Sequence, residues 1–274
     1  MQLRSDILSF SEKPIGIFDS GLGGLTLVKA IKEKLPYENI VYLGDSLNVP
    51  YGDKTPGQIT EFAFWNTQFL IEKGVKAVAI ACNTADGTAR REIQECFTLP
   101  LVGVIAPAAE KAASLTRNKK VGVIATQAAV KSGAYERALR SYLSDCQVFS
   151  APAPRLVPLI EAGKITSEDS DTVEALREYI LPLRDKGIDT LILGCTHYPL
   201  ILELVKDIVP GMNIVCSGTA SIGALTEKLR AEGLLNTSGV SGTAEYFVTG
   251  DPTEFGRHAG VFLGENIEGK VQKA

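Results

Sequence analysis

Short runs of aliphatic residues alternate with amphipathic segments along most of this 274-residue chain. Continuous apolar runs predict strands covered on both faces, whereas apolar residues spaced three and four apart predict helices. Strands are predicted at Ile15–Phe18, Ile40–Leu43, Ala77–Ala81, Leu101–Val104, Val121–Ala125, Thr190–Leu193, Ile214–Cys216 and Tyr246–Thr249. Helices are expected between them, for example at Leu22–Leu35, Ile59–Glu72, Ala134–Leu143 and Thr172–Arg184. This alternation is typical of an α/β fold with mainly parallel sheets flanked by helices.

Two segments of the chain repeat one another position by position. KGVKAVAIACNTA (73–85) and KGIDTLILGCTHY (186–198) each hold Lys-Gly, a predicted strand and then a cysteine. PIGIFDS (14–20) and KVGVIAT (120–126) also share a strand followed by a hydroxyl residue. The repeat predicts two related lobes with the active site in the cleft between them. We divide the chain into a first lobe (14–106), a second lobe (107–216), a C-terminal return to the first lobe (217–264) and peripheral tails (1–13 and 265–274).

Composition and charge narrow the class of protein. With 45% apolar and 22% charged residues, the chain can fill one large or two small hydrophobic cores. The net charge is −4 and the basic residues are scattered, so we expect no nucleic-acid ligand. The sequence shows neither a signal-peptide core nor an apolar run of about 20 residues, which predicts no membrane association and a cytoplasmic location.

The five cysteines include no CxxC pair, and in a reducing cytosol all five are expected to be thiols. Cys82 and Cys195 each follow a predicted strand and are followed by Thr and by an amide or imidazole side chain, a context that Cys96, Cys146 and Cys216 lack. A lone strand-end cysteine is commonly a small buried apolar residue, but two at equivalent positions favour catalysis. Amide groups at the start of a helix are expected to shift both thiols towards thiolate. The chain has only two histidines, His197 and His258, so no metal site is expected.

Two thiols that face each other across a closed cleft can invert a carbon centre. One removes a proton, and the other delivers a proton to the opposite face. The pair could also be redox-active, but no resolving cysteine can be named. DSGLGG (19–24) lacks the third glycine of a dinucleotide loop and the Lys-Ser/Thr of a P-loop, so no nucleotide cofactor is expected.

A set of motifs in a fixed order resembles the glutamate racemases of the aspartate/glutamate racemase superfamily. The motifs are DSGLGG (19–24), GDSLNVPYG (44–52), ACNTA (81–85), LVPLIEAG (156–163) and LGCTHYP (193–199), and the resemblance runs from about residue 14 to residue 264. It implies an isomerase that interconverts L- and D-glutamate without a cofactor and supplies D-glutamate for peptidoglycan, cell-wall biogenesis and cell shape. Glutamate is the implied small-molecule partner, and a homodimer is a hypothesis that the sequence leaves open.

The resemblance also implies roles for individual residues. Cys82 and Cys195 would be the two acid/base thiols, and Asp19 and His197 would be catalytic groups that support them. Substrate contacts are implied for Asp19, Ser20, Tyr51, Gly52, Asn83, Thr84, Thr196 and His197, and supporting roles for Asp45, Glu161 and Thr126. Uncharged donors at helix N-termini suit a dicarboxylate because they require no buried cation, although Thr and Asn also serve there as N-caps.

Four positions depart from the usual pattern of the family, namely Asp86, Asn48, Ala129 and Cys216. The carboxylate of Asp86 is expected to add negative potential near Cys82 and the substrate. The alternative is an ion pair with Arg90 on the helix surface. Two other functions stay open: a racemase of the same superfamily for aspartate or another amino acid, and a non-catalytic amino-acid-binding protein.

Overall fold

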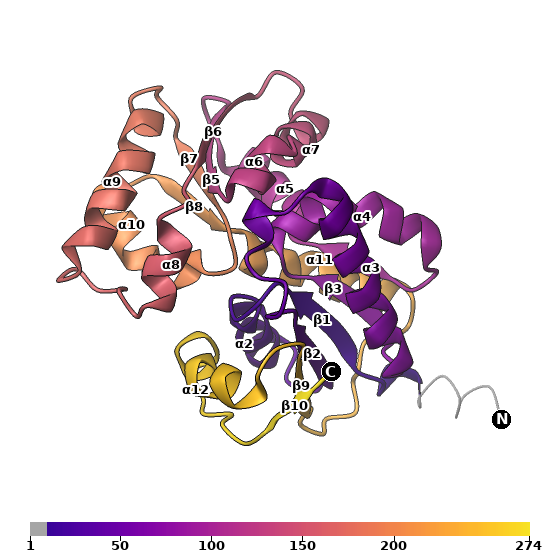
Figure 1. Ribbon diagram of the computed structural model, residues 1–274. Helices are drawn as coiled ribbons and strands as arrows, with labels where there is room; N and C mark the ends of the chain where they lie inside the picture. Colours follow the sequence, from indigo (N-terminus) through magenta and orange to yellow (C-terminus); the bar gives the residue numbers. More distant parts are fainter. Residues whose placement is uncertain (1–9) are drawn as a thin grey trace.

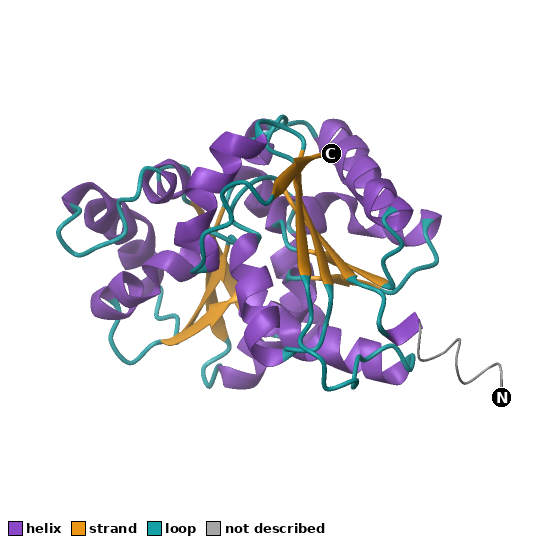
Figure 2. Cartoon of the chain, turned by 90° about the horizontal axis from the view of Figure 1, so that it is seen from below, coloured by secondary structure: helices purple, strands orange, loops and turns teal. Residues whose placement is uncertain are grey.

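The computed structural model describes residues 10–274 and contains two β-sheets flanked by helices (Figure 1). Every strand pair in both sheets is parallel. Viewed from below, the strands form two separate groups with helices around each (Figure 2). The predicted α/β class with two mainly parallel sheets is therefore confirmed.

The first sheet has the strand order β10-β9-β2-β1-β3-β4. Its strands are β1 (Ile15–Asp19), β2 (Ile40–Gly44), β3 (Ala77–Ile80), β4 (Leu101–Gly103), β9 (Ala244–Val248) and β10 (Val271–Lys273). The three central strands, β1, β2 and β3, are buried along their whole length. Burial on both faces explains why their sequences are apolar without alternation.

The second sheet repeats the topology of the first. Its order is β6-β5-β7-β8, with strands β5 (Lys120–Ala125), β6 (Gln147–Pro152), β7 (Thr190–Gly194) and β8 (Asn213–Cys216). The first four strands of the chain lie in the equivalent order β2-β1-β3-β4. β3 therefore lies beside β1 as β7 lies beside β5. The sequence repeat is a repeat of topology, and the two cysteine strands occupy the same place in the two sheets.

Helices cover both sheets and join them. They are α2 (Leu25–Lys34), α3 (Pro56–Glu72), α4 (Asn83–Cys96), α5 (Ile105–Leu115), α6 (Gln127–Lys131), α7 (Ala134–Tyr142), α8 (Leu156–Glu161), α9 (Ser170–Arg184), α10 (Leu202–Ile208), α11 (Ser217–Ala231) and α12 (Pro252–Leu263), with 3-10 turns η1 (Tyr51–Asp53) and η2 (Tyr198–Ile201). α11 packs against both α2 and α5. One apolar cluster accordingly contains residues of both sheets, among them Ile17 and Leu193.

The sequence predicted the strands better than the ends of the chain. Every predicted strand is present with small shifts at its ends, but β6 and β10 were not predicted. β6 is only partly buried and reads Gln-Val-Phe-Ser-Ala-Pro, which gives no continuous apolar run. Within the predicted peripheral tail 265–274, residues 271–273 form β10, which pairs with β9 at the edge of the first sheet. Most of the other predicted tail, 1–13, lies outside the described residues, and the lobe boundaries stay a prediction.

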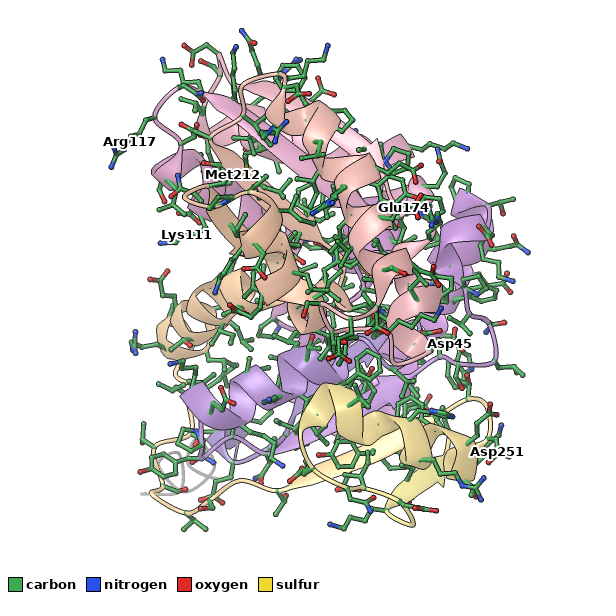
Figure 3. All side chains as sticks on the ribbon, turned by 90° about the vertical axis from the view of Figure 1, so that its left-hand side faces the viewer. Asp45, Lys111, Arg117, Glu174, Met212 and Asp251 are labelled. Atoms are coloured by element: carbon green, nitrogen blue, oxygen red, sulfur yellow. The ribbon has the colours of Figure 1, made fainter. Side chains whose placement is uncertain are left out.

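Other features of residues 10–274 bear on the remaining predictions. All five cysteines are free thiols, as predicted. None of the described helices combines the length and the apolar character that a membrane crossing requires. The exposed side chains of Lys111 and Arg117 project from one edge of the molecule, whereas Asp45 is buried (Figure 3).

Candidate active site

One cavity of about 340 Å³, called the inner cavity here, collects all but one of the predicted site residues. Of these predicted residues, its lining contains Asp19, Ser20, Tyr51, Gly52, Cys82, Asn83, Thr84, Thr126, Glu161, Cys195, Thr196 and His197. Several of them directly follow β1 and β3 of the first sheet and β5 and β7 of the second. Because parallel strands end at one edge of a sheet, the repeat brings polar residues of both lobes to one space.

Cys82 lies between β3 and α4 and occupies the N-cap position of α4. It is 5% exposed, and its Sγ lies 3.7 Å from Oγ of Ser20. Burial raises the pKa of the Cys82 thiol to about 12, and the Asp19 carboxylate adds to the rise. The N–H of Ala85 and the Ser20 hydroxyl oppose it. The prediction that the start of a helix shifts this thiol towards thiolate is wrong, because burial outweighs the amide groups.

Cys195 follows β7, but no α-helix begins beside it. The 3-10 turn η2 starts three residues later and has His197 at its N-cap position. The Sγ of Cys195 lies 3.7 Å from Nδ1 of His197, and Nε2 of that ring lies 2.9 Å from Oε1 of Glu161. Burial lowers the pKa of His197, but the hydrogen bonds to Cys195 and Glu161, together with the charges of Cys195 and Asp19, raise it to about 10. The Cys195 thiolate and the Glu161 carboxylate therefore both favour the imidazolium form of His197.

Asp19 holds the loop between β1 and α2. Its Oδ2 accepts hydrogen bonds from the N–H groups of Gly21 (3.3 Å) and Gly24 (2.9 Å). A Cβ at position 24 would lie 2.5 Å from Cβ of Asp19, so glycine is required for this approach. The other oxygen, Oδ1, is buried and has no hydrogen-bond partner among the described residues. An unpartnered buried carboxylate oxygen at a cavity is available for a ligand.

The first turn of α4 contacts the second lobe through its polar side chains. The hydroxyl of Tyr135 donates to Oδ1 of Asn83 (2.5 Å), and the hydroxyls of Thr84 and Thr126 lie 2.8 Å apart. Thr126 is also the N-cap of α6, where its Oγ1 accepts from the N–H of Ala129. Thr84 and Asn83 thus belong both to the cavity wall and to the contact between the lobes.

Asp45 is the predicted residue that the inner cavity excludes. Its Oδ2 accepts from the hydroxyl of Tyr51 (2.5 Å), and its Oδ1 accepts from the hydroxyl of Thr249 (2.7 Å). Nδ2 of Asn48, one of the departures from the family pattern, also donates to this carboxylate. Asp45 therefore lies behind the cavity wall and positions Tyr51 within it.

Sequence reasoning missed part of the cavity wall. The additional lining residues are Val49, Pro50, Asp53, Gln127, Ala153, Pro154, Val157 and Pro158. Several of them are sequence neighbours of a predicted site residue, and this proximity could have identified them as lining residues. Ala153 and Pro154 follow β6. Because β6 was not predicted, the residues after it were not expected at the site.

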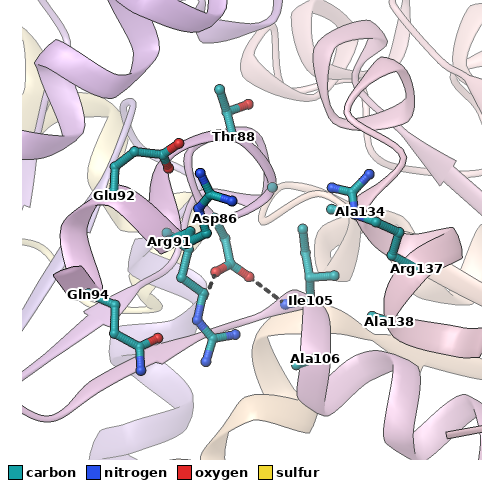
Figure 4. Close-up of a pocket in the computed structure, with 12 residues that line it drawn as sticks. Asp86, Thr88, Arg91, Glu92, Gln94, Ile105, Ala106, Ala134, Arg137 and Ala138 are labelled. Atoms are coloured by element: carbon teal, nitrogen blue, oxygen red, sulfur yellow. Dashed lines mark hydrogen bonds and ion pairs between the residues drawn. The ribbon is translucent and has the colours of Figure 1, made fainter. Parts of the chain in front are cut away.

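Asp86 does not line the inner cavity; it lines a separate pocket together with Ile105 and Ala106 of α5 (Figure 4). Its Oδ2 accepts from the N–H of Ile105 at the start of α5 (2.7 Å), and its Oδ1 lies 3.9 Å from Nε of Arg90. The side chain is buried, and a Cβ on Gly103 would lie only 1.8 Å from Oδ1. Asp86 therefore does not face the substrate cavity, and its predicted pairing with Arg90 is present, although the carboxylate is buried instead of lying on the helix surface. It caps the N-terminus of a neighbouring helix.

Two thiols in one cavity, each with its own polar partner, suit proton transfer to and from opposite faces of a substrate. Cys82 and Cys195 are close enough for the charge of Cys195 to raise the pKa of Cys82. Within residues 10–274, no three His, Cys, Asp or Glu side chains are grouped as a metal site would require.

Known proteins resemble this chain over nearly its whole length. Residues 25–225 match the family described as Asp/Glu/Hydantoin racemase. A glutamate racemase of Desulforudis audaxviator is 40% identical over 261 residues, which are 93% of this chain and 95% of the relative. The crystal structure of a glutamate racemase isoform from Bacillus anthracis matches with a TM-score of 0.91 and 33% identity, covering 96% of this chain and 98% of that chain. A glutamate racemase from Francisella tularensis, in complex with D-glutamate, matches with a TM-score of 0.88 and 34% identity over 96% of this chain and 98% of that one. The chain belongs to the Asp/Glu/Hydantoin racemase family and, within it, to the glutamate racemases.

Proposed function

We propose that this protein interconverts L- and D-glutamate with Cys82 and Cys195 as the two acid/base groups. The observation that carries the proposal is that two buried thiols, from equivalent strand ends of two lobes, line one cavity. The names of the relatives, and the D-glutamate in the Francisella tularensis complex, support glutamate as the substrate.

In this mechanism one cysteine thiolate removes the α-proton of glutamate. The electron pair of the broken C–H bond stays on the α-carbon until the thiol of the other cysteine gives its proton to the opposite face. Neither sulfur forms a bond to carbon, and the configuration is inverted. The ammonium group of the substrate would favour thiolate formation, because an opposite charge lowers the pKa of a buried thiol.

Polar groups of the cavity would hold the substrate. Oδ1 of Asp19, which lacks a partner among the described residues, is suited to accept from the ammonium group. Asn83, Thr84 and Thr196 line the cavity and would donate to the carboxylates. His197 would support Cys195, and Asp19 would act beside Cys82.

The biological role and the assembly belong to the same proposal. D-Glutamate formed by this reaction would supply peptidoglycan synthesis. The chain would form a homodimer, and light scattering of the purified protein tests this assembly. Aspartate stays the alternative substrate, because one methylene changes binding by only about 1–3 kcal/mol. Structures of an aspartate racemase from Picrophilus torridus and of an aspartate racemase homologue from Pyrococcus horikoshii, at 22% and 19% identity, match in fold alone.

The test is racemisation of each glutamate enantiomer by purified protein, dialysed against a chelator and assayed without added cofactor. Chiral chromatography should show both directions for the wild type and for Cys96→Ser, since Cys96 is exposed and outside the cavity. Cys82→Ser and Cys195→Ser should each lose racemisation by at least about 100-fold, because each direction needs both an acid and a base. Near-wild-type racemisation by either variant would disprove the two-thiol assignment. Binding without racemisation or α-proton exchange by the wild type would identify a binding protein.

A further inference from the structure

Tyr135 is a buried tyrosine of the second lobe that does not line the inner cavity. It is the second residue of α7 and packs in an apolar cluster with Ala125 and Ile192. Its ring lies against the end of β7, where a Cβ on Gly194 would come within 2.9 Å of Cε2 of Tyr135. Gly194 directly precedes Cys195, so the tyrosine ring packs at the point where the chain leaves its strand to reach the second thiol.

The hydroxyl of Tyr135 reaches across to the first lobe. It donates a hydrogen bond to Oδ1 of Asn83 (2.5 Å), the first residue of α4 and the one that follows Cys82. Burial raises the pKa of Tyr135, and Ser217 opposes the rise without offsetting it. The phenol therefore keeps its proton at neutral pH and remains a hydrogen-bond donor. A single side chain thus contacts a sequence neighbour of each thiol.

The hydrogen bond from Tyr135 decides which end of the Asn83 amide is left for a ligand. An asparagine side chain has one acceptor oxygen and one donor nitrogen, and here the oxygen is occupied by the phenol. Nδ2 is buried and has no hydrogen-bond partner among residues 10–274. Asn83 lines the inner cavity. Because a buried N–H without a partner is unfavourable, an acceptor supplied by the substrate would complete this site.

We propose that Tyr135 is a positioning residue for the reaction: it holds Oδ1 of Asn83 so that Nδ2 donates to a carboxylate of bound glutamate. This inference rests on the proposed function. Without the phenol, the amide is free to turn its oxygen towards the carboxylate, and two acceptors would then face each other. Since Tyr135 and Asn83 belong to different lobes, the donor is held in place only when the lobes lie as they do in this structure.

Tyr135→Phe tests the proposal, because it removes the hydroxyl and keeps the ring beside Gly194. The KM for both glutamate enantiomers should rise about tenfold, since a hydrogen bond to a charged carboxylate is lost. The value of kcat should stay within about threefold, because the carboxylate is bound alike in the ground state and the transition state. Tyr142→Phe is the matched control on the same helix, where the side chain is exposed, and it should keep the wild-type KM.

A double-mutant cycle with Asn83 separates positioning from a general structural role. Asn83→Ala removes the proposed donor and should itself raise KM about tenfold or more. Adding Tyr135→Phe to Asn83→Ala should then change KM by less than about twofold, because the hydroxyl has no amide left to hold. A tyrosine that only stabilises the fold would have the same effect on KM in both backgrounds. Thermal melting of each variant shows that the proteins compared are folded.

An unchanged KM in folded Tyr135→Phe would overturn the proposal, and so would an unchanged KM in Asn83→Ala, which needs no change at Tyr135. A loss of kcat with the wild-type KM in Tyr135→Phe would also overturn it, and would show that the tyrosine acts on Cys195 through Gly194. Absence of racemisation by the wild type would instead contradict the proposed function.

Discussion

At the scale of single residues, burial and one neighbouring carboxylate decide the chemistry of Cys82. The thiol lies at a helix N-terminus, which favours an anion, yet its pKa is raised to about 12. After burial, the charge of Asp19 makes the largest contribution to this rise. Substrate-free protein therefore holds Cys82 as a neutral thiol at pH 7, and the thiolate forms only when pH rises or when a cation enters the cavity.

Replacing Asp19 by Asn should therefore lower the pKa of Cys82. The thiolate is the species that iodoacetamide alkylates, so the midpoint of the pH dependence of alkylation at Cys82 should move to lower pH. Peptide mass spectrometry separates this site from the exposed Cys96. Ser20→Ala is the matched control, because the Ser20 hydroxyl lowers the pKa and its removal should move the midpoint to higher pH. An unchanged midpoint in Asp19→Asn would contradict the assigned role of the carboxylate.

At the scale of elements, Asp86 links α4, whose N-cap is Cys82, to α5, the helix that connects the first sheet to the second along the chain. Asp86 lies in the first turn of α4 and accepts a hydrogen bond from the first N–H of α5. In turn, α5 packs on α7 and on strands β7 and β8 of the second sheet. Burial raises the pKa of Asp86, and Arg90 together with the N–H groups of Val104 and Ile105 opposes the rise. The carboxylate is thus a structural cap that fits against Gly103.

Asp86→Ala should destabilise the fold by about 1–3 kcal/mol, because it leaves the buried N–H of Ile105 without a partner. Gly103→Ala should also destabilise, because the added Cβ would overlap Oδ1 of Asp86. Urea denaturation of the double variant should show that Gly103→Ala costs less once Asp86 is absent. Glu92→Ala, at an exposed position of the same helix, should change stability by about 0.5 kcal/mol or less. Strictly additive losses would show that the two positions do not touch.

At the scale of the whole molecule, the loop after β1 packs directly on the residues after Cys195. The hydroxyl of Thr26 donates to the carbonyl of Thr196 (2.9 Å). A Cβ on Gly23 would lie 2.3 Å from Oγ1 of Thr196 and 2.4 Å from Nδ1 of His197. The lobes can therefore approach this closely only with glycine at position 23.

Gly23→Ala should lower kcat/KM by about 100-fold, because displacement of His197 or of a whole lobe by about 1 Å misplaces the second thiol. Gly223→Ala, where an added Cβ meets nothing within 4 Å, should keep wild-type kinetics and gain slightly in stability because it lies inside a helix. Steady-state kinetics and thermal melting of both variants make the comparison. Wild-type kinetics in Gly23→Ala would show that the lobes have room that the structure does not indicate.

Much of the candidate site was predictable because its residues directly follow strands. Cys82, Asn83 and Thr84 follow β3, and Cys195 and His197 follow β7, so apolar runs located them. Glu161 and Asp45 could be named from motifs, but their contacts could not be predicted. Glu161 pairs with His197 across 36 positions of the chain, and Asp45 pairs with Thr249 across 204.

The sequence by itself determined the α/β class, the repeat and the two cysteines, because these depend on local periodicity and on the residues just after each strand. Only the tertiary structure decided that the Asp86 side chain caps α5 and that the pKa of Cys82 is high. It also decided that Glu161 pairs with His197 and that residues 271–273 form a strand. Each of these depends on burial or on a partner distant in the chain. A helix N-terminus can be predicted from neighbouring residues, but the packing around it cannot, and here the packing sets the state of the thiol.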